Sequence, residues 1–363
     1  MTDVVCYYHD PVKAPLLRDA VLPALAAHPG VQAHLERHWL HGPHIRIRLD
    51  GAEDAAAAIS GRLREHLAAH PSTVEIPESE LRADAASAGV AELLLPPFEP
   101  FYPNNSVRIE PADAVRTTEL LSSPALVALR DEGLRLGVPA VREFLAELGQ
   151  AGDTSQARVR LTVSALAVHA SRYPNGLRFG YHSFLSHLED FLLASDPDGR
   201  VRDRFDRIWA ANVEPVTESV RRVADGHPTT EFEAAWQTWT IGMRLAAEKR
   251  QSRGELTGAP NPAYGQRAYE TGDLAAIRRY NVAEREKFSD YHRQLSTVDI
   301  RDPRIERPFT VYRFGVNVLY QLLKICDVTP MERYLAASMV VNAVQRITGT
   351  TWSEQLAAMP RAQ

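Results

Sequence analysis

The segment His41-Gly42-Pro43-His44-Ile45-Arg46-Ile47-Arg48 decides the fold of the first part of this 363-residue chain. Residues 31–39 and 44–49 alternate apolar and polar side chains, and the Gly-Pro pair between them favours a turn, so a β-hairpin is predicted. Side chains in a strand alternate between its two faces. In the second strand one face is therefore apolar, and the other carries His44, Arg46 and Arg48.

Strand and helix patterns also alternate on either side of this hairpin. Residues 4–8 are a short β-prone run, residues 14–27 have helical apolar spacing, and residues 52–69 form an Ala-rich amphipathic helix pattern. The order strand, helix, strand, strand, helix is typical of a ferredoxin-like layer.

The pattern changes from residue 96 onward. Residues 96–111 are rich in proline and aromatic residues and are predicted to be a loop or boundary, because proline does not fit a helix interior. Residues 251–266, with several Gly and Pro, are predicted to be a mobile loop. The other predicted elements are helices at 113–121, 124–136, 139–149, 155–172, 181–194, 202–224, 229–250, 266–295, 309–325 and 330–347. We therefore expect an α+β protein with a small ferredoxin-like α/β layer, residues 1–110, packed on a larger, mostly helical region, residues 111–363.

Composition excludes several classes of function. A net charge of -5 and a pI near 6.2 argue against a general nucleic-acid binder, which would be basic. No apolar run approaches the length of about 18 residues needed to span a membrane. The first residues lack the basic start and apolar core of a signal peptide, so a cytoplasmic location is expected.

Metal and cofactor sites are not expected. Cys6 and Cys326 are too few for a disulfide framework or a cysteine-rich zinc site, and are predicted to be small core residues. His38, His41 and His44 are the nearest approach to a metal cluster, but the turn should make their imidazoles diverge. Phosphate-binding and dinucleotide-binding glycine motifs are absent from the sequence.

Arg46 and Arg48 are the first candidates for chemistry. Two guanidinium groups on one strand face beside His44 would suit binding a carboxylate or stabilising an enolate as it develops. The alternative interpretation is the exposed polar face of an edge strand.

Two helical segments contribute further candidates. In residues 179–192, Ser183 and Ser186 fit the start of a helix, and His187 is either a hydrogen-bonded core residue or a catalyst. In residues 309–320, Tyr312, Arg313 and Asn317 are the polar exceptions in an apolar helix. Arg313 and Asn317 lie one turn apart, and either a site or a hydrogen bond between helices would explain them.

Together, three stretches resemble the standalone relatives of the lantibiotic dehydratase C-terminal domain, also called the thiopeptide-type bacteriocin biosynthesis family. They are HW…HGPHIRIRL at 38–49, GYHSFLSHLEDFL at 180–192 and YRFGVNVLYQLLKICDVTPMERY at 312–334. The resemblance runs from about residue 4 to residue 350. It implies a tailoring enzyme for ribosomally synthesised, post-translationally modified peptides of the lanthipeptide or thiopeptide type.

The family divides in its chemistry. One branch eliminates glutamate from glutamylated Ser or Thr to leave dehydroalanine or dehydrobutyrine. A second joins two dehydroalanines into the six-membered ring of thiopeptides and expels the leader peptide, and other members could assist closure of thioether (lanthionine) rings. Arg46 and Arg48 match the paired arginines of the eliminating branch. That branch also has a late histidine before an Asn-Arg pair, whereas residues 312–318 here contain no histidine and no arginine after Asn317.

This departure favours a ring-forming enzyme. A glutamate-eliminating lyase and a non-catalytic, leader-binding partner subunit remain the alternatives. For ring formation, the resemblance implies that Arg46 and Arg48 hold the reacting amide oxygen, while His44, His187 or Tyr312 moves the proton and Arg313 assists. His41, Ser183, Ser186 and Asn317 would bind substrate.

The implied partners are the precursor peptide, as leader plus dehydrated core, and other biosynthetic enzymes of the same cluster. The leader would dock at a sheet edge in residues 1–110, and residues 111–363 would complete the active-site groove. Neither a cofactor nor a metal is implied, since zinc-dependent cyclases need a Cys/His set that this chain does not supply.

Overall fold

The computed structural model describes residues 1–51, 53–112, 120–121, 123–226, 228–258 and 262–361. The chain forms two compact units. Unit 1 comprises Met1–Leu145, Ala259–Glu286 and Lys324–Asp327, and unit 2 comprises Ala146–Gly258, Lys287–Leu323 and Val328–Gln363. The predicted division at residue 110 stays a prediction.

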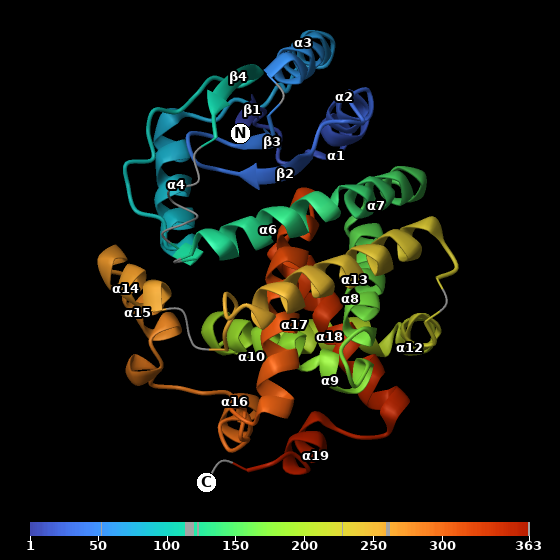
Figure 1. Ribbon diagram of the computed structural model, residues 1–363. Helices are drawn as coiled ribbons and strands as arrows, with labels where there is room; N and C mark the ends of the chain where they lie inside the picture. The colour runs from blue at the N-terminus through green and yellow to red at the C-terminus, as the bar shows by residue number, and fades with distance from the viewer. Residues whose placement is uncertain (52, 113–119, 122, 227, 259–261, 362–363) are drawn as a thin grey trace. The chain divides into compact units, whose positions relative to one another are not determined.

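A four-stranded antiparallel sheet organises unit 1 (Figure 1). Its strands β1 (Thr2–Tyr7), β2 (Ala33–His38), β3 (His44–Leu49) and β4 (Ser106–Pro111) are ordered β2-β3-β1-β4. The predicted hairpin is confirmed as β2 and β3, with His38 opposite His44. Because β3 lies inside the sheet, the interpretation of its arginines as the face of an edge strand is wrong.

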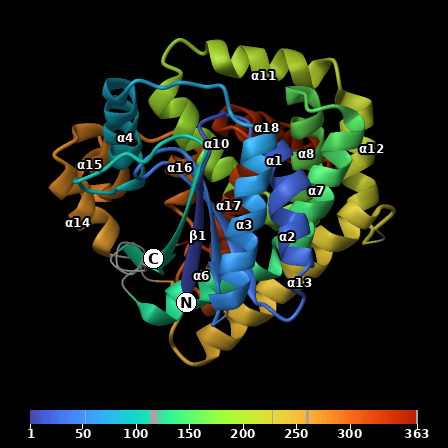
Figure 2. The same cartoon turned by 90° about the horizontal axis from the view of Figure 1, so that it is seen from above.

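The apolar face of the sheet carries the core of unit 1. Ile45, Ile47 and Leu49 of β3 are fully buried, as are Ile59 and Leu63 of α3. Helix α3 contacts β1, β4 and η1, and Figure 2 shows it running alongside β1. The opposite, polar face is contacted at β2 by α6.

Helices complete unit 1. They are α1 (Ala14–Leu16), η1 (Leu17–Val21), α2 (Leu22–Ala26), α3 (Glu53–Ala69), α4 (Glu78–Glu92), α6 (Pro124–Leu136), most of α7 (Val138–Ala151), α14 (Pro262–Thr271), α15 (Leu274–Tyr280) and η2 (Val282–Glu284). The α+β class predicted from sequence is confirmed, whereas the ferredoxin-like layering remains a prediction.

The regular elements in the described part of unit 2 are helices, apart from an isolated antiparallel bridge between Val298 and Arg361. Its helices are α8 (Ser155–Ser171), α9 (Leu177–Gly180), α10 (His182–Ser195), α11 (Arg200–Ala210), α12 (Val213–Ala224), α13 (Glu231–Ser252), α16 (Asp290–Leu295), α17 (Pro303–Ile325, whose last two residues belong to unit 1), α18 (Pro330–Thr348) and α19 (Trp352–Ala357). Helices α8 and α18 pack on each other, and α12 packs on both. The sequence defines both ends of α18, through a Thr329/Glu332 capping box and a left-handed Gly349.

Several predicted boundaries are wrong for local reasons. The helix predicted at 202–224 is two helices, because Pro215 has no N–H to donate to residue 211 and the chain breaks there. The helix predicted at 266–295 is interrupted at Gly272, which has φ of 69°, and Asp273 then caps α15. Strand β4 lies inside the stretch predicted as a proline-rich loop. Most of the helix predicted at 113–121, and residues 259–261 of the predicted mobile loop, lie outside the described residues.

Cys6 and Cys326 are both buried free thiols, as predicted. Among the described helices, none combines the length and apolar character needed to cross a membrane.

Candidate functional site

The polar face of β3 separates the two predicted arginines. Arg48 donates from Nε and Nη2 to the two carboxylate oxygens of Asp3, each at 2.8 Å, and both side chains are only 3% exposed. Such a bidentate pair commits the guanidinium to Asp3. Arg46 is 17% exposed, and its Nε lies 3.5 Å from the Asp3 carboxylate without forming a hydrogen bond to any described residue. Arg46 is therefore the more available of the two.

His44 is a neutral acceptor on the same face. Its side chain is fully buried, and Nδ1 lies 2.9 Å from the Gly42 carbonyl, which can only accept, so Nδ1 carries the proton. Burial, helped by the nearby charge of Arg46, holds the pKa of His44 well below its usual value. The other nitrogen, Nε2, has no hydrogen-bond partner within the described chain.

The hairpin histidines His38, His41 and His44 are not among the groups of possible metal ligands found in the described residues. His38 and His44 stack with their centroids 5.9 Å apart, but His41 bonds instead through Nδ1 to the Phe98 carbonyl, at 2.9 Å. The predicted divergence of the imidazoles is therefore wrong for His38 and His44, which stack, while His41 makes a separate contact.

A different group, His34, Glu36 and Asp131, brings potential metal-ligand atoms within 4.8 Å of one another. Arg130 contacts both carboxylates, at 3.0 Å for Glu36 and 2.7 Å for Asp131. Burial favours the neutral form of Glu36, but the Arg130 guanidinium outweighs it and holds the pKa of Glu36 well below 4.5. This group is a buried ion network that joins α6 to β2.

Unit 2 contains a cavity of about 240 Å³ between the end of α8, α13 and the first turns of α17. Its walls are mainly apolar, with several polar groups. The lining residues are His169, Arg172, Tyr173, Pro174, Thr240, Met243, Arg244, Glu248, Gln251, Arg307, Pro308, Val311, Tyr312 and Gly315.

Tyr312 is the one predicted site residue among them. Its ring stacks on His169 at 4.7 Å and meets Tyr173 edge-on at 5.0 Å. The buried Tyr312 hydroxyl has no hydrogen-bond partner among the residues that the structure describes. Burial raises the pKa of Tyr312 well above 10, so this group keeps its proton and is a donor.

His169 and Gly315 shape the wall beside Tyr312. His169 Nδ1 lies 3.3 Å from the Thr240 hydroxyl, and burial lowers the pKa of His169 to about 3, so the imidazole is neutral near pH 7. A Cβ atom on Gly315 would lie 3.1 Å from His169 Cε1, so only glycine leaves this ring undisturbed.

The remaining predicted residues of unit 2 do not line the cavity. His187 Nδ1 lies 3.2 Å from the Tyr320 hydroxyl, and Ser186 Oγ lies 2.9 Å from His292 Nε2, so both side chains bond between helices. Ser183 is buried, Arg313 lies beside the Phe309 ring, and Asn317 is exposed.

Sequence reasoning missed His169 and the cavity arginines. One signal for His169 was present in the sequence, because this residue directly follows the apolar run of residues 165–168. Nothing in the sequence indicated that this residue would stack on Tyr312.

No protein-family model matches the chain, and no curated protein does. Solved structures, however, do match the chain. The pyridine synthase TbtD, from thiomuracin biosynthesis, superposes with a TM-score of 0.71 at 21% identity over 96% of this chain and 98% of that one. The chain has the pyridine-synthase fold.

The protein TsrL also shares this fold, with a TM-score of 0.65 at 17% identity over 100% of this chain and 99% of that one. Both superpositions run over nearly the whole chain, so the likeness includes the sheet and the helices. The resemblance noted in the sequence is thus confirmed at the level of the fold.

Proposed function

We propose that this protein is a tailoring enzyme that closes a ring in a leader-bound, dehydrated precursor of a ribosomally synthesised peptide. The likeness to the thiomuracin pyridine synthase supports the class of reaction, but a fold alone does not set an activity. The observation that carries the proposal is the buried Tyr312 hydroxyl in a mainly apolar cavity, without a hydrogen-bond partner among the described residues.

An unsatisfied buried hydroxyl costs free energy, and a substrate acceptor would recover it. Ring closure from dehydroamino acids develops negative charge on a peptide carbonyl oxygen. A donor that is already in place, in a mainly apolar cavity, stabilises that charge without reorganising. In this role Tyr312 holds the carbonyl oxygen, and neutral His169 keeps the phenol ring in position.

For unit 1 we propose a smaller set of catalytic groups than the sequence suggested. Arg46 and His44 remain proposed site groups, because each has a nitrogen without a hydrogen bond to any described residue. Arg48 keeps Asp3 paired and so acts on the strand rather than on the substrate.

We propose that the sheet is the ferredoxin-like layer that receives the leader peptide, at its β4 edge. Strand β4 is an outer strand, and its Ile109 is 45% exposed. A hollow of about 440 Å³ lined by His9, residues 72–76 and residues 101–105 adjoins the start of β4 and gives a peptide room beyond the strand.

The test is to incubate the protein with a dehydroalanine-containing precursor and to weigh the products. Loss of the leader with a new ring indicates the pyridine-type cycloaddition, and loss of a free thiol without a mass change indicates thioether closure. Either result supports the proposal, provided that Tyr312→Phe is much slower.

A glutamylated precursor separates the alternatives. Loss of glutamate would show an eliminating lyase, and tight precursor binding without product from either substrate would show a leader-binding subunit. Both results would overturn the ring-forming proposal.

A further inference from the structure

The cavity around Tyr312 carries an excess of positive charge. Arg172, Arg244 and Arg307 line it, and Glu248 is the one carboxylate among its lining residues. We propose that these arginines bind a carboxylate of the substrate, next to the reacting group held by Tyr312. This inference rests on the proposed function and specifies the substrate class of the same site: a dehydroamino-acid unit with a carboxylate close to it.

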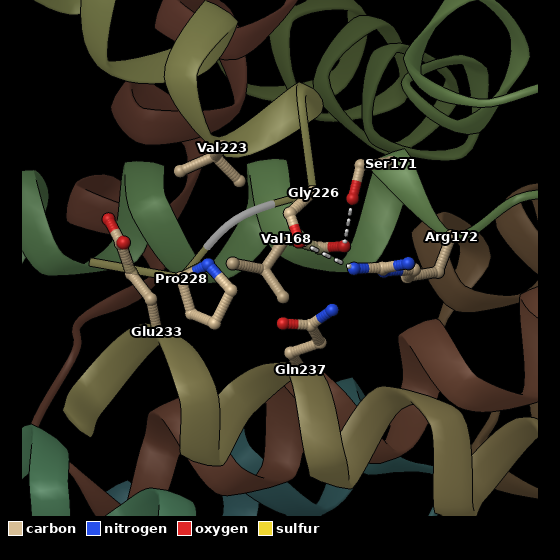
Figure 3. A pocket seen from close by; sticks show the side chains of 8 residues that line it. All are labelled: Val168, Ser171, Arg172, Val223, Gly226, Pro228, Glu233 and Gln237. Atoms are coloured by element: carbon tan, nitrogen blue, oxygen red, sulfur yellow. Dashed lines mark hydrogen bonds between the residues drawn. The ribbon is translucent and has the colours of Figure 1, made fainter. Parts of the chain in front are cut away.

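Arg172 has unused hydrogen-bonding capacity. Its Nη2 reaches the Gly226 carbonyl at 3.5 Å, the contact drawn in Figure 3, while its buried Nε bonds to no described residue. A charged donor left like this in a protein wall is costly unless an acceptor arrives.

The small pocket on the other side of Arg172 is too small for a carboxylate of the substrate. It has only about 10 Å³ of open volume, which is at most one water molecule. A carboxylate that meets Arg172 must therefore lie in the larger cavity, which Arg172 also lines.

The other two arginines are only weakly satisfied by protein groups. Arg244 Nε lies 3.6 Å from the Glu248 carboxylate, and these side chains are 41% and 50% exposed, so the pair contributes little. The Arg307 guanidinium makes no ion pair or hydrogen bond with the described residues, although the Arg307 carbonyl accepts from Gln251. His169 is neutral and adds no charge. The excess positive charge of the cavity therefore lies on guanidinium groups, which pair well with carboxylates.

The volume limits the size of the group. A cavity of about 240 Å³ has the volume of about eight water molecules in the liquid. It has room for one residue-sized unit with an anionic end.

The probe is N-acetyldehydroalanine, compared with its neutral methyl ester by chemical-shift titration at low salt. We expect the acid to bind at least about tenfold more tightly than the ester, the ratio that a charge-assisted hydrogen bond supplies. Arg172→Met and Arg307→Met should each lower the affinity for the acid until it is close to the affinity for the ester. Arg204→Met, at an exposed arginine of α11 outside the cavity, should leave the ratio unchanged. Circular dichroism checks that each variant is folded.

Equal binding of acid and ester, or a preference unchanged in both cavity variants, would overturn the inference. The source of the carboxylate follows from precursors with a C-terminal amide or with an acidic side chain changed to its amide. The change that raises KM by about tenfold and leaves kcat unchanged identifies which carboxylate binds the arginines. A KM that neither change affects would again overturn the inference.

Failure of this inference can be told apart from failure of the proposed function. Ring formation from the precursor, with no acid preference, leaves the function standing without the carboxylate site. An acid preference that needs the arginines, with no product, leaves the binding site standing without the proposed reaction.

Discussion

Tyr312 couples stability and activity through one hydroxyl group. Because this buried group has no hydrogen-bond partner in the described structure, Tyr312→Phe should not lower the free energy of unfolding, and should raise it by about 1 kcal/mol. The same change should slow ring formation about 100-fold, the effect of removing one positioned donor. Urea unfolding and single-turnover product formation measure the two effects. An unchanged rate would remove Tyr312 from the proposed mechanism.

Gly315 tests the wall of the cavity. In Gly315→Ala the gain in helix propensity, about 1 kcal/mol, opposes the contact of the new Cβ with His169, at 3.1 Å. We therefore expect little net change in stability but several-fold weaker binding of N-acetyldehydroalanine. Gly61→Ala on α3 is the matched control, since its Cβ would meet nothing within 4 Å and should only stabilise. Unchanged binding in Gly315→Ala would show that the His169 wall does not touch the ligand.

At the scale of elements, the register of β3 sets which charges face each other on the polar face of the sheet. Asp3 lies directly opposite Arg48 across the β1–β3 pair, and Glu36 of β2 lies opposite Arg46. The two arginines on this strand face therefore differ in function: Arg48 pairs closely with Asp3, and Arg46 does not.

This difference predicts that two matched substitutions, one at each arginine, lower the free energy of unfolding by very different amounts. Arg48→Met leaves the buried Asp3 with only Arg46, at 3.5 Å, and should cost about 3 kcal/mol of unfolding free energy, the low end of the range for a broken buried pair. Arg46→Met keeps the Asp3–Arg48 pair and should cost less than about 1 kcal/mol, while lowering product formation if Arg46 contacts substrate. Adding Asp3→Asn to Arg48→Met should restore part of the stability. Equal destabilisation by the two single changes would contradict the assignment.

At the scale of the whole molecule, buried neutral histidines should make the protein sensitive to acid. Burial lowers the pKa of His169 to about 3 and that of His182 to about 4. In the unfolded chain both would titrate near 6.5. Below that pH the unfolded state binds more protons, so stability is complete above pH 6.5 and falls as the pH approaches 4.

The expected slope is at most about 1.4 kcal/mol per pH unit for each histidine. Urea midpoints measured from pH 7.5 to 4.5 should show the fall. His182→Gln should flatten the curve, whereas His70→Gln, at an exposed position, should leave it unchanged. Stability that rises on acidification would contradict this account of His169 and His182.

The sequence by itself determined the features that depend on near neighbours. Alternation in residues 31–49 was enough to predict the β2–β3 hairpin, and alternating strand and helix patterns to predict the α+β class. It also placed Tyr312 among polar exceptions in an apolar helix, because helical periodicity is a local property.

Only the tertiary structure decided which of these residues form a site. Arg46 and Arg48 are equivalent in spacing, but they differ because Asp3, from another strand, pairs with one of them. Likewise His169 of α8 and Tyr312 of α17 meet through the packing of distant helices. Such contacts, and the volume that they leave open, arise from the close packing of remote segments, which no local pattern encodes.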